Sequence, residues 1–322
     1  MMENLFIVKS PLQIINAIEA MEYFKLENNI LLILHDDNKK NSLSMSNIAQ
    51  MREWDIILHK KKVKKVKFLR DIFFIKKITR KKYHYVFTSH ITTFHRLLLS
   101  NVSANRIIYL DDGIETIVRY KDSILKNNLN KFNVKYLKYL FFGLKFNICY
   151  PIDFFTYFDL QDFRNSKIIR NDLKHFQKKY FQNMQEDEVT YILGQPLVKV
   201  GFLTQDDYFL AIDRIREKKG GKIVYIPHRN EIISERLKSY EGENFELRDI
   251  NMPVELYFLE QKIYPKEIVS FITTAFFTLH KLYSKTHMCY VYIPKEKILR
   301  DPDIIENHYA SIAKLGIERL EL

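Results

Sequence analysis

The sequence feature that most constrains the fold is an apolar run that ends in two adjacent carboxylates and a glycine. The residues from Ile107 to Leu110 are apolar, and Asp111, Asp112 and Gly113 follow directly. A buried strand that ends in this way is typical of open α/β sheets, which bind ligands beyond the carboxyl ends of their strands. A carboxylate there can act as a general base. The alternative is a helix start, with Asp111 as the cap and Asp112 in the first turn.

Strand-like apolar runs alternate with helical patterns along the whole chain. In the first part the predicted strands are Leu5–Val8, Asn29–Leu34, Tyr83–Ser89 and Ile107–Leu110. After a polar and aromatic stretch the alternation restarts, and the predicted strands are Val189–Leu193, Lys222–Ile226, Phe245–Leu247, Glu267–Ile272 and Met288–Ile293. Strands separated by helices form mainly parallel sheets. The pattern therefore predicts an α/β protein with two Rossmann-like domains that face a cleft.

Chain length and the break in the pattern predict the domain limits. A chain of 322 residues exceeds what one hydrophobic core usually organises. We expect an N-terminal domain at residues 1–187, which carries the Asp-Asp-Gly motif, and a C-terminal domain at residues 188–300. Residues 301–322 begin with Asp301 as a helix cap and contain Gly316 as a stop. We expect this last helix to pack back towards the N-terminal domain.

The formal net charge of +12 is concentrated in one segment. Twelve lysines and arginines lie between Lys60 and Lys82, interleaved with apolar residues, and the segment Lys131–Phe142 has the same basic and aromatic character. Such segments can rest on anionic lipid, where each cation contributes about 1 kcal/mol, or contact acidic glycans. They can also be solvated helix faces above an ordinary core. We expect residues 60–82 to contact an anionic membrane surface.

Cysteine content and hydropathy indicate the compartment. Cys149 and Cys289 are the only cysteines, and no Cys/His cluster has zinc spacing. No run reaches about 18 uninterrupted apolar residues, so no membrane-spanning helix is expected. The first residues are typical of a strand rather than of a secretory leader. We therefore expect a cytoplasmic protein, peripheral on the inner face of the cytoplasmic membrane.

Candidate phosphate-binding residues follow two predicted strands of the second half. His228 and Arg229 can hold a phosphate leaving group, and the histidine can also transfer a proton to it. The hydroxyls of Thr273 and Thr274, with the N–H groups of a following helix, can bind an anion. Each pair has an alternative reading, because His228 can be a loop residue without a role and Thr273 a helix cap.

Three more positions fit a nucleotide site. Glu255 lies at the start of a helix, where it can accept hydrogen bonds from ribose hydroxyls or simply favour the helix dipole. Gly194 and Gln195 follow the first strand of the second domain and would let the backbone approach a ligand closely. The sequence contains neither a P-loop nor the spaced glycines of dinucleotide-binding proteins.

In their order along the chain, these motifs resemble those of the bacterial sialyltransferases of the lipooligosaccharide sialyltransferase and capsule polysialyltransferase type. The matching positions are Ser10-Pro11-Leu12-Gln13, Asp111-Asp112-Gly113, His228, Pro253-Val254-Glu255 and Thr273-Thr274. Arg229 stands where the family has a proline, and the two threonines stand where it has serines. The likeness covers nearly the whole chain through short motifs.

The resemblance implies the GT-B architecture and an inverting transfer without a metal or other cofactor. Sialic acid or a related sugar acid would move from a CMP-sugar donor to a hydroxyl of a surface glycan or glycolipid, in lipooligosaccharide or capsule. Asp112 would be the base because it adjoins Gly113, where a sugar can come close, and Asp111 would orient the loop. Ser10 and Gln13 would lie on the acceptor side.

On the donor side His228, Thr273 and Thr274 would stabilise the departing phosphate. Gly194, Gln195, Arg229 and Glu255 would bind the nucleotide. The first alternative is a GT-B transferase that uses CMP-Kdo, CMP-pseudaminic acid or a UDP-sugar. An alternative from another class is a basic nucleic-acid-binding protein without catalysis. We do not expect nucleic acid as a partner, because that reading gives the strand-end residues no role.

Overall fold

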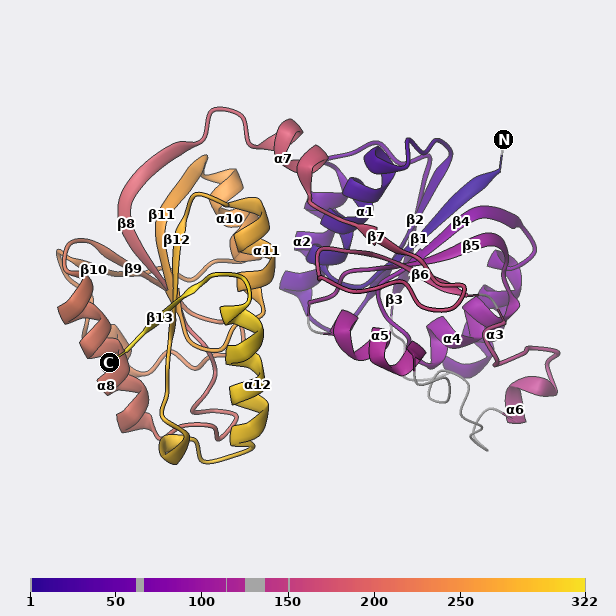
Figure 1. The fold of residues 1–322 in the computed structure, drawn as a ribbon. Coiled ribbons are helices and arrows are strands. Elements are labelled where there is room, and N and C mark those ends of the chain that lie inside the picture. Colours follow the sequence, from indigo (N-terminus) through magenta and orange to yellow (C-terminus); the bar gives the residue numbers. More distant parts are fainter. Residues whose placement is uncertain (1, 62–66, 114, 125–136, 150, 322) are drawn as a thin grey trace. The chain divides into compact units, whose positions relative to one another are not determined.

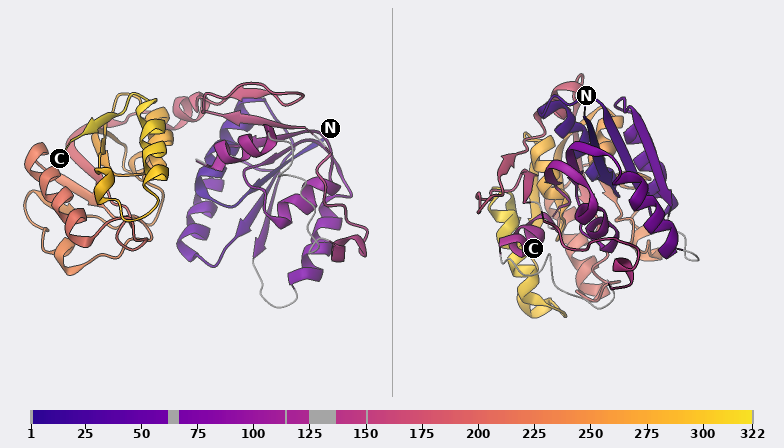
Figure 2. Two further views of the ribbon diagram at one scale, coloured as in Figure 1. Left: turned by 60° about the horizontal axis from the view of Figure 1, so that its bottom comes forward. Right: turned by 90° about the vertical axis from the view of Figure 1, so that its right-hand side faces the viewer.

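The computed structural model describes residues 2–61, 67–113, 115–124, 137–149 and 151–321 (Figure 1). The chain divides into two compact units, residues 1–179 and 180–322, and helices flank the sheet of each unit (Figure 2). Within the described residues, none of the helices combines the length and the hydropathy that a membrane span needs.

The first unit is built on a seven-stranded sheet in the order β3-β2-β1-β4-β5-β6-β7, with every neighbouring pair parallel. The strands are β1 (Glu3–Val8), β2 (Asn29–His35), β3 (Ile56–Lys61), β4 (Lys82–Thr88), β5 (Ser103–Leu110), β6 (Ile152–Thr156) and β7 (Ile168–Arg170). The helices are α1 (Pro11–Tyr23), α2 (Lys39–Ala49), α3 (Lys67–Ile78), α4 (Thr93–Asn101), α5 (Glu115–Ile124), α6 (Leu137–Leu140) and α7 (Lys174–Tyr180). The strand order reverses between β1 and β4, which makes their carboxyl ends the topological switch point.

Alternating side chains divide the core of this unit between the two faces of the sheet. Leu5 and Ile7 of β1 belong to the buried cluster that also contains the inner residues of α3 and α4, such as Ile75. Phe6, between them, stacks on Phe87 of β4 with ring centroids 4.3 Å apart, on the opposite face. Because both faces of β1 are covered, its residues from Leu5 to Val8 are all apolar rather than alternating.

The second unit is built on a six-stranded parallel sheet in the order β10-β9-β8-β11-β12-β13. The strands are β8 (Gln185–Leu193), β9 (Ile223–Ile226), β10 (Phe245–Leu247), β11 (Ile263–Ser270), β12 (His287–Val291) and β13 (Glu318–Leu320). The helices are α8 (Gln205–Lys219), α9 (Glu235–Lys238), α10 (Val254–Glu260), α11 (Ala275–Leu282), the 3-10 helix η2 (Lys295–Lys297) and α12 (Pro302–Ala313). Helix α8 lies on one face of the sheet, and α11 and α12 lie on the other (Figure 1). The strand order reverses between β8 and β11.

The predicted α/β class with two parallel sheets is confirmed, and several boundaries differ from the prediction. The units meet at residues 179 and 180 rather than at 187 and 188. Residues 301–322 belong to the second unit, where the Tyr309 hydroxyl accepts a hydrogen bond from the Ile293 N–H at 3.2 Å and β13 extends the sheet. Residues 302–320 thus form a helix and a strand of the second unit, and the packing of this helix towards the N-terminal domain stays a prediction.

The basic segment 60–82 is not one helix. Lys60 and Lys61 end the strand β3, α3 begins at Lys67, and Lys82 begins β4. β3 was not predicted because it is an exposed edge strand whose last residues are lysines. Residues 62–66 of this segment lie outside the described part.

Candidate functional site

In the first unit, the predicted acceptor-side residues gather at the switch point. Ser10 and Gln13 follow β1, and Asp111, Asp112 and Gly113 follow β5. These positions are the carboxyl edge of the sheet, where open α/β sheets bind ligands.

Asp111 is completely buried and serves as an anchor for the neighbouring strand. Its carboxylate accepts hydrogen bonds from the Thr156 hydroxyl at 2.6 Å and from the Tyr157 N–H at 2.8 Å, at the end of β6. Burial raises the pKa of Asp111 to about 7, although these bonds and one from Thr116 favour the ionised form. A substrate cannot touch this carboxylate, because the protein covers it.

Asp112 is the carboxylate of the pair that solvent reaches, with a side chain 24% exposed. Its backbone N–H donates to the Thr116 hydroxyl at 3.0 Å. Burial raises the pKa of Asp112, and a hydrogen bond from Gln13 and the charges of His90 and Lys9 oppose that rise. The carboxylate is thus held in place and can still reach an incoming hydroxyl.

The Ser-Pro-Leu-Gln motif positions this carboxylate. Ser10 caps α1, and its hydroxyl accepts from the Gln13 N–H at 3.4 Å. The side-chain oxygen Oε1 of Gln13 accepts a hydrogen bond from the Lys9 N–H at 2.7 Å. This bond fixes the side-chain amide of Gln13, which also bonds to Asp112. The motif thereby joins the end of β1 to the end of β5.

The turn after Asp112 separates this site from the helix that follows. Gly113 has a φ of 60°, in the left-handed region that glycine adopts without strain. The described residues of helix α5 begin at Glu115, so Asp111 and Asp112 precede them.

His90 belongs to the same site, and the sequence reasoning missed it. It follows β4, and its Nδ1 lies 3.8 Å from Asp112 Oδ2 and 3.9 Å from Glu115 Oε1. Burial lowers the pKa of His90, and the carboxylate of Asp112 acts in the opposite direction. A signal was available, because the end of β4 was predicted and the strand-end rule applies there as it does to β5.

Polar side chains on the inner face of α1 complete the first-unit site. Asn16 donates from its amide to the Asp111 carbonyl at 3.2 Å, and its own carbonyl oxygen accepts from Asn171 at 2.8 Å. Glu19 accepts from the N–H groups of His175 and Phe176 at the start of α7. Helix α1 therefore joins the segment before the unit boundary to the base of the Asp-Asp-Gly turn.

In the second unit, His228 is half-buried at the end of β9 and has a defined tautomer. Its Nδ1 accepts the Asn230 N–H at 3.1 Å, so the ring proton lies on Nε2. Burial lowers the pKa of His228, and the neighbouring charge of Arg229 adds to this. A neutral imidazole with an Nε2–H donates a hydrogen bond to an anion but holds no spare proton near pH 7.

A half-buried carboxylate, that of Glu231, orients the His228 loop. Glu231 accepts the His228 N–H at 3.0 Å and the hydroxyls of Tyr225 and Tyr208 at 2.5 and 2.9 Å. The Tyr208 hydroxyl in turn accepts from the Gln195 N–H at 3.0 Å, which ties the loop after β8 to the loop after β9. The sequence reasoning missed Glu231, Tyr208 and Tyr225.

A glycine is needed at position 194 for a reason other than the predicted one. A Cβ at this position would collide with the carboxylate of Glu231 and the phenol of Tyr225. The space beside Gly194 is therefore filled by these two side chains, and the glycine accommodates them rather than the close approach of a ligand.

Glu255 and the threonines lie near the same edge of the sheet. Glu255 is buried at the start of α10, and burial raises its pKa to about 7. Thr273 follows β11 and accepts the Ala275 N–H at 3.2 Å, as in the helix-cap alternative. Thr274 is exposed and makes no side-chain cap bond, so its hydroxyl faces solvent.

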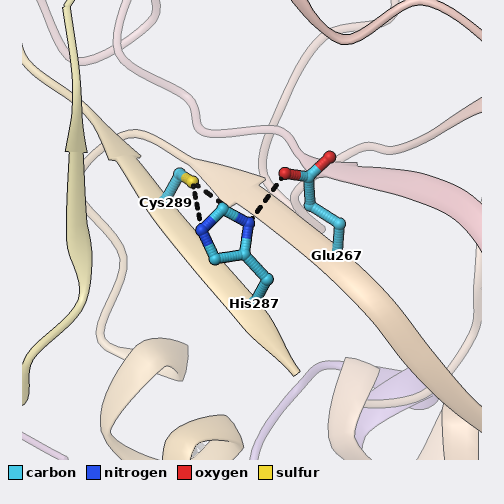
Figure 3. Close-up of side chains that lie close together, drawn as sticks. All are labelled: Glu267, His287 and Cys289. Carbon is cyan, nitrogen blue, oxygen red and sulfur yellow. Dashed lines mark hydrogen bonds and ion pairs between the residues drawn. The ribbon is translucent and has the colours of Figure 1, made fainter. Parts of the chain in front are cut away.

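One group among the described residues has the composition of a metal site, and it lies elsewhere (Figure 3). His287 Nδ1 is 3.0 Å from Glu267 Oε1, and Cys289 Sγ is 3.8 Å from the ring. Lys219 already places its ammonium 2.6 Å from Glu267. Burial lowers the pKa of His287, but hydrogen bonds to Glu318 and Glu267 outweigh it and raise the pKa overall.

The position and charges of this group are those of an ion-pair network. His287 and Glu318 are the first residues of β12 and β13, so the group lies at the amino ends of these strands, away from His228 and Thr274. The ammonium of Lys219 and the ring of His287 lie beside its carboxylates.

The predicted residues thus form two groups, one in each unit. In the first unit the accessible carboxylate is that of Asp112, and Ser10, Gln13 and Gly113 lie around it. His228, Arg229, Gln195 and Thr274 follow three neighbouring strands in the second, an arrangement with hydrogen-bond donors and a cation for an anion.

Comparisons with known proteins agree with the architecture. The sequence matches no protein-family model, and no curated protein is significantly similar to it in sequence. Arabidopsis thaliana UGT89C1 complexed with UDP-L-rhamnose has a TM-score of 0.55 and 8% identity, over 100% of this chain and 85% of that one. The UDP complex of S. aureus MnaA has a TM-score of 0.52 and 11% identity, over 98% and 88% of the two chains.

A third structure, Phytolacca americana UGT2 complexed with UDP-2fluoro-glucose and pterostilbene, has a TM-score of 0.51 and 10% identity, over 99% and 85%. The identities are low, and the likeness extends over both units. The chain therefore has the fold of the GT-B glycosyltransferases.

The two aspartates should respond differently to the same substitution. Asp111→Asn places an amide NH2 or a neutral oxygen where two buried donors need an acceptor, and we expect it to lower the free energy of unfolding by about 2 kcal/mol. Asp112→Asn should change it little, because that side chain is partly exposed. Urea denaturation of both variants at neutral pH measures the difference, and equal stabilities would contradict the anchoring role of Asp111.

Glu255→Gln should change how stability depends on pH. The folded pKa of about 7 lies above the ordinary 4.5, so the fold favours the protonated group, and this contribution is lost as pH rises from about 4.5 to 7. Between pH 4.5 and pH 8 the variant should gain up to about 3 kcal/mol over the wild type. Thermal melting across this range checks it. Glu260→Gln, exposed at the end of the same helix, is the control, and matching curves for the two variants would refute the buried ionisation.

Proposed function

We propose that the protein is an inverting glycosyltransferase that moves sialic acid, or a related sugar acid, from a CMP-sugar to a hydroxyl of a surface glycan. The observation that carries the proposal is the reachable carboxylate of Asp112 at the switch point of a GT-B-type sheet, beside the buried Asp111. The acceptor would belong to lipooligosaccharide or capsule, as the motif resemblance implies.

Asp112 has the properties of the base for such a displacement. Its raised pKa makes it a better proton acceptor than an ordinary surface aspartate. His90 Nδ1, a buried atom, lies 3.8 Å from Asp112 Oδ2, so the ring stands beside the proposed base. In the transfer, the acceptor hydroxyl loses its proton to Asp112 and attacks the anomeric carbon as the bond from that carbon to the phosphate breaks.

The second unit supplies groups for the departing nucleotide. His228 would donate its Nε2–H to the phosphate as a neutral ring, Thr274 would donate its exposed hydroxyl, and Arg229 would add a positive charge. Glu255 would accept hydrogen bonds from the ribose. In this scheme the chain's own donors stabilise the leaving phosphate, so the transfer needs no metal.

The second candidate is a GT-B transferase with a UDP-sugar donor. It is favoured by the solved structures of similar fold, of which UGT89C1 is complexed with UDP-L-rhamnose and MnaA with UDP. Both candidates need a base that takes the proton from the acceptor hydroxyl, so the short motifs of the first unit fit either one.

A donor screen in excess EDTA tests the proposal. With CMP-sialic acid, CMP-Kdo, CMP-pseudaminic acid and UDP-sugars as donors, we expect nucleotide release only from a CMP-sugar, with inhibition by CMP and not by UDP. Asp112→Asn should reduce the rate by about 100- to 10,000-fold, the usual contribution of a general base. Release from a UDP-sugar alone would establish the second candidate. Activity that EDTA abolishes and magnesium restores would reject the metal-free mechanism.

His228→Ala should lower turnover while leaving the acceptor KM nearly unchanged, because the ring would act on the leaving phosphate and not on the acceptor. The fall of kcat/KM on acidification should persist in this variant, since it reflects protonation of Asp112, whose pKa is raised above the ordinary carboxyl value. His280→Ala, a half-buried histidine of α11, is the control. Turnover unchanged in His228→Ala would remove the histidine from the mechanism.

A further inference from the structure

Two basic and aromatic segments that are far apart in the sequence lie side by side in the first unit (Figure 1). Phe68 of α3 packs against Tyr139 and Phe142, with ring centroids 5.0 and 5.4 Å away. The ammonium of Lys138 lies 4.7 Å from the centre of the Phe68 ring. We call the exposed part of residues 68–78 and 137–142 the α3–α6 surface.

Large apolar side chains on this surface are exposed to solvent. Phe141 is 90% exposed and Phe73 is 69% exposed, and Leu69, Leu140 and Phe142 are exposed by 41, 46 and 36%. The opposite sides of both segments form ordinary core. An exposed group of this kind, outside the core that its neighbours build, marks a site of interaction.

The charges around these side chains are positive. Phe73 has Arg70, Lys76 and Lys77 one turn away on the same exposed side of α3. The one acidic residue of α3, Asp71, is buried and bonds to the ammonium of Lys60 at 2.5 Å.

The α6 segment continues this pattern. Residues 137–149 contain Lys138 and Lys145 and no acidic residue. An anionic partner therefore meets no repulsion from acidic residues of either segment.

We propose that the α3–α6 surface binds an anionic lipid bilayer. Phenylalanine and leucine without a polar group, flanked by lysine and arginine, are the composition that sits at the boundary of headgroups and acyl chains. Phe73 and Phe141 would enter that boundary, and Arg70, Lys76 and Lys77 would contact the headgroup phosphates. This proposal does not depend on the transfer reaction, because it uses none of the residues assigned to it.

Vesicle co-sedimentation of the full chain tests the proposal. Phosphatidylcholine vesicles that contain about one third phosphatidylglycerol should bind the protein, and pure phosphatidylcholine vesicles should bind it weakly. Binding should fall with rising salt, because exposed charges are screened. Lys76→Gln with Lys77→Gln should weaken binding about 25-fold, about fivefold for each cation. Binding that ignores lipid charge, salt and these lysines would overturn the proposal.

The aromatic part is tested by a matched pair of variants. Phe73→Ser with Phe141→Ser should lose most vesicle binding. Ile232→Ser with Leu299→Ser, which removes two apolar residues of the second unit that are 70 and 61% exposed, should bind like the wild type. Asp112→Asn should also bind like the wild type. If the phenylalanine variant kept its affinity, or if it changed only the oligomeric state in light scattering, the surface would not be a membrane site.

A tryptophan placed on the surface reports its depth directly. Phe141→Trp should shift its emission to the blue and be quenched by brominated lipid, while Ile232→Trp should show neither change beyond the background of Trp54. Emission from Phe141→Trp that stays unchanged on addition of anionic vesicles would contradict insertion at this position.

Discussion

A single buried carboxylate holds the first-unit site together. Asp111 is fully covered, and its hydrogen bonds to Thr156 and Tyr157 fix the end of β6 against the end of β5. Its backbone carbonyl receives Asn16, which brings α1 to the same point. A charge in such a place is costly unless it is bonded, so these donors are a condition of the fold. The position of Asp112 at the surface is a consequence, because the preceding residue cannot move.

The second unit repeats this arrangement with other residues. Glu231 is the half-buried carboxylate there, and it bonds to the backbone of His228 and to the hydroxyls of Tyr208 and Tyr225. In both units a hydrogen-bonded acid fixes the main chain of a strand-end loop, while a nearby side chain of that loop remains accessible. Gly194 is part of the same arrangement, since any larger residue would displace the acid. Rigid loops of this kind present a functional group without the entropy cost of ordering it on binding.

The sequence was sufficient for the class of fold and for the strands that contain an uninterrupted apolar run, such as Leu5–Val8 and Ile223–Ile226. It failed where tertiary contacts override the local pattern. β6 was missed because Asp153 interrupts its apolar residues. That charge is tolerated because Arg106, from β5, pairs with it at 2.6 Å and the Lys167 N–H donates to it at 2.8 Å. The sequence also could not tell which of Asp111 and Asp112 is covered, because covering depends on Thr156 across the sheet. His90 lies just beyond the carboxyl end of β4, so the expectation that ligand-binding residues follow strand ends applies to it as it does to Asp112.

The hydrogen bond that fixes the ring of His228 comes from main chain rather than from a side chain. Asn230 supplies it through its backbone N–H, which every residue except proline possesses. The side chain at this position can therefore vary widely without changing which ring nitrogen carries the proton. If natural selection keeps the proton of His228 on Nε2, the only sign of it at position 230 would be that proline is excluded there. The path of the backbone thus fixes the tautomer of His228, and a comparison of conserved side chains would not detect this.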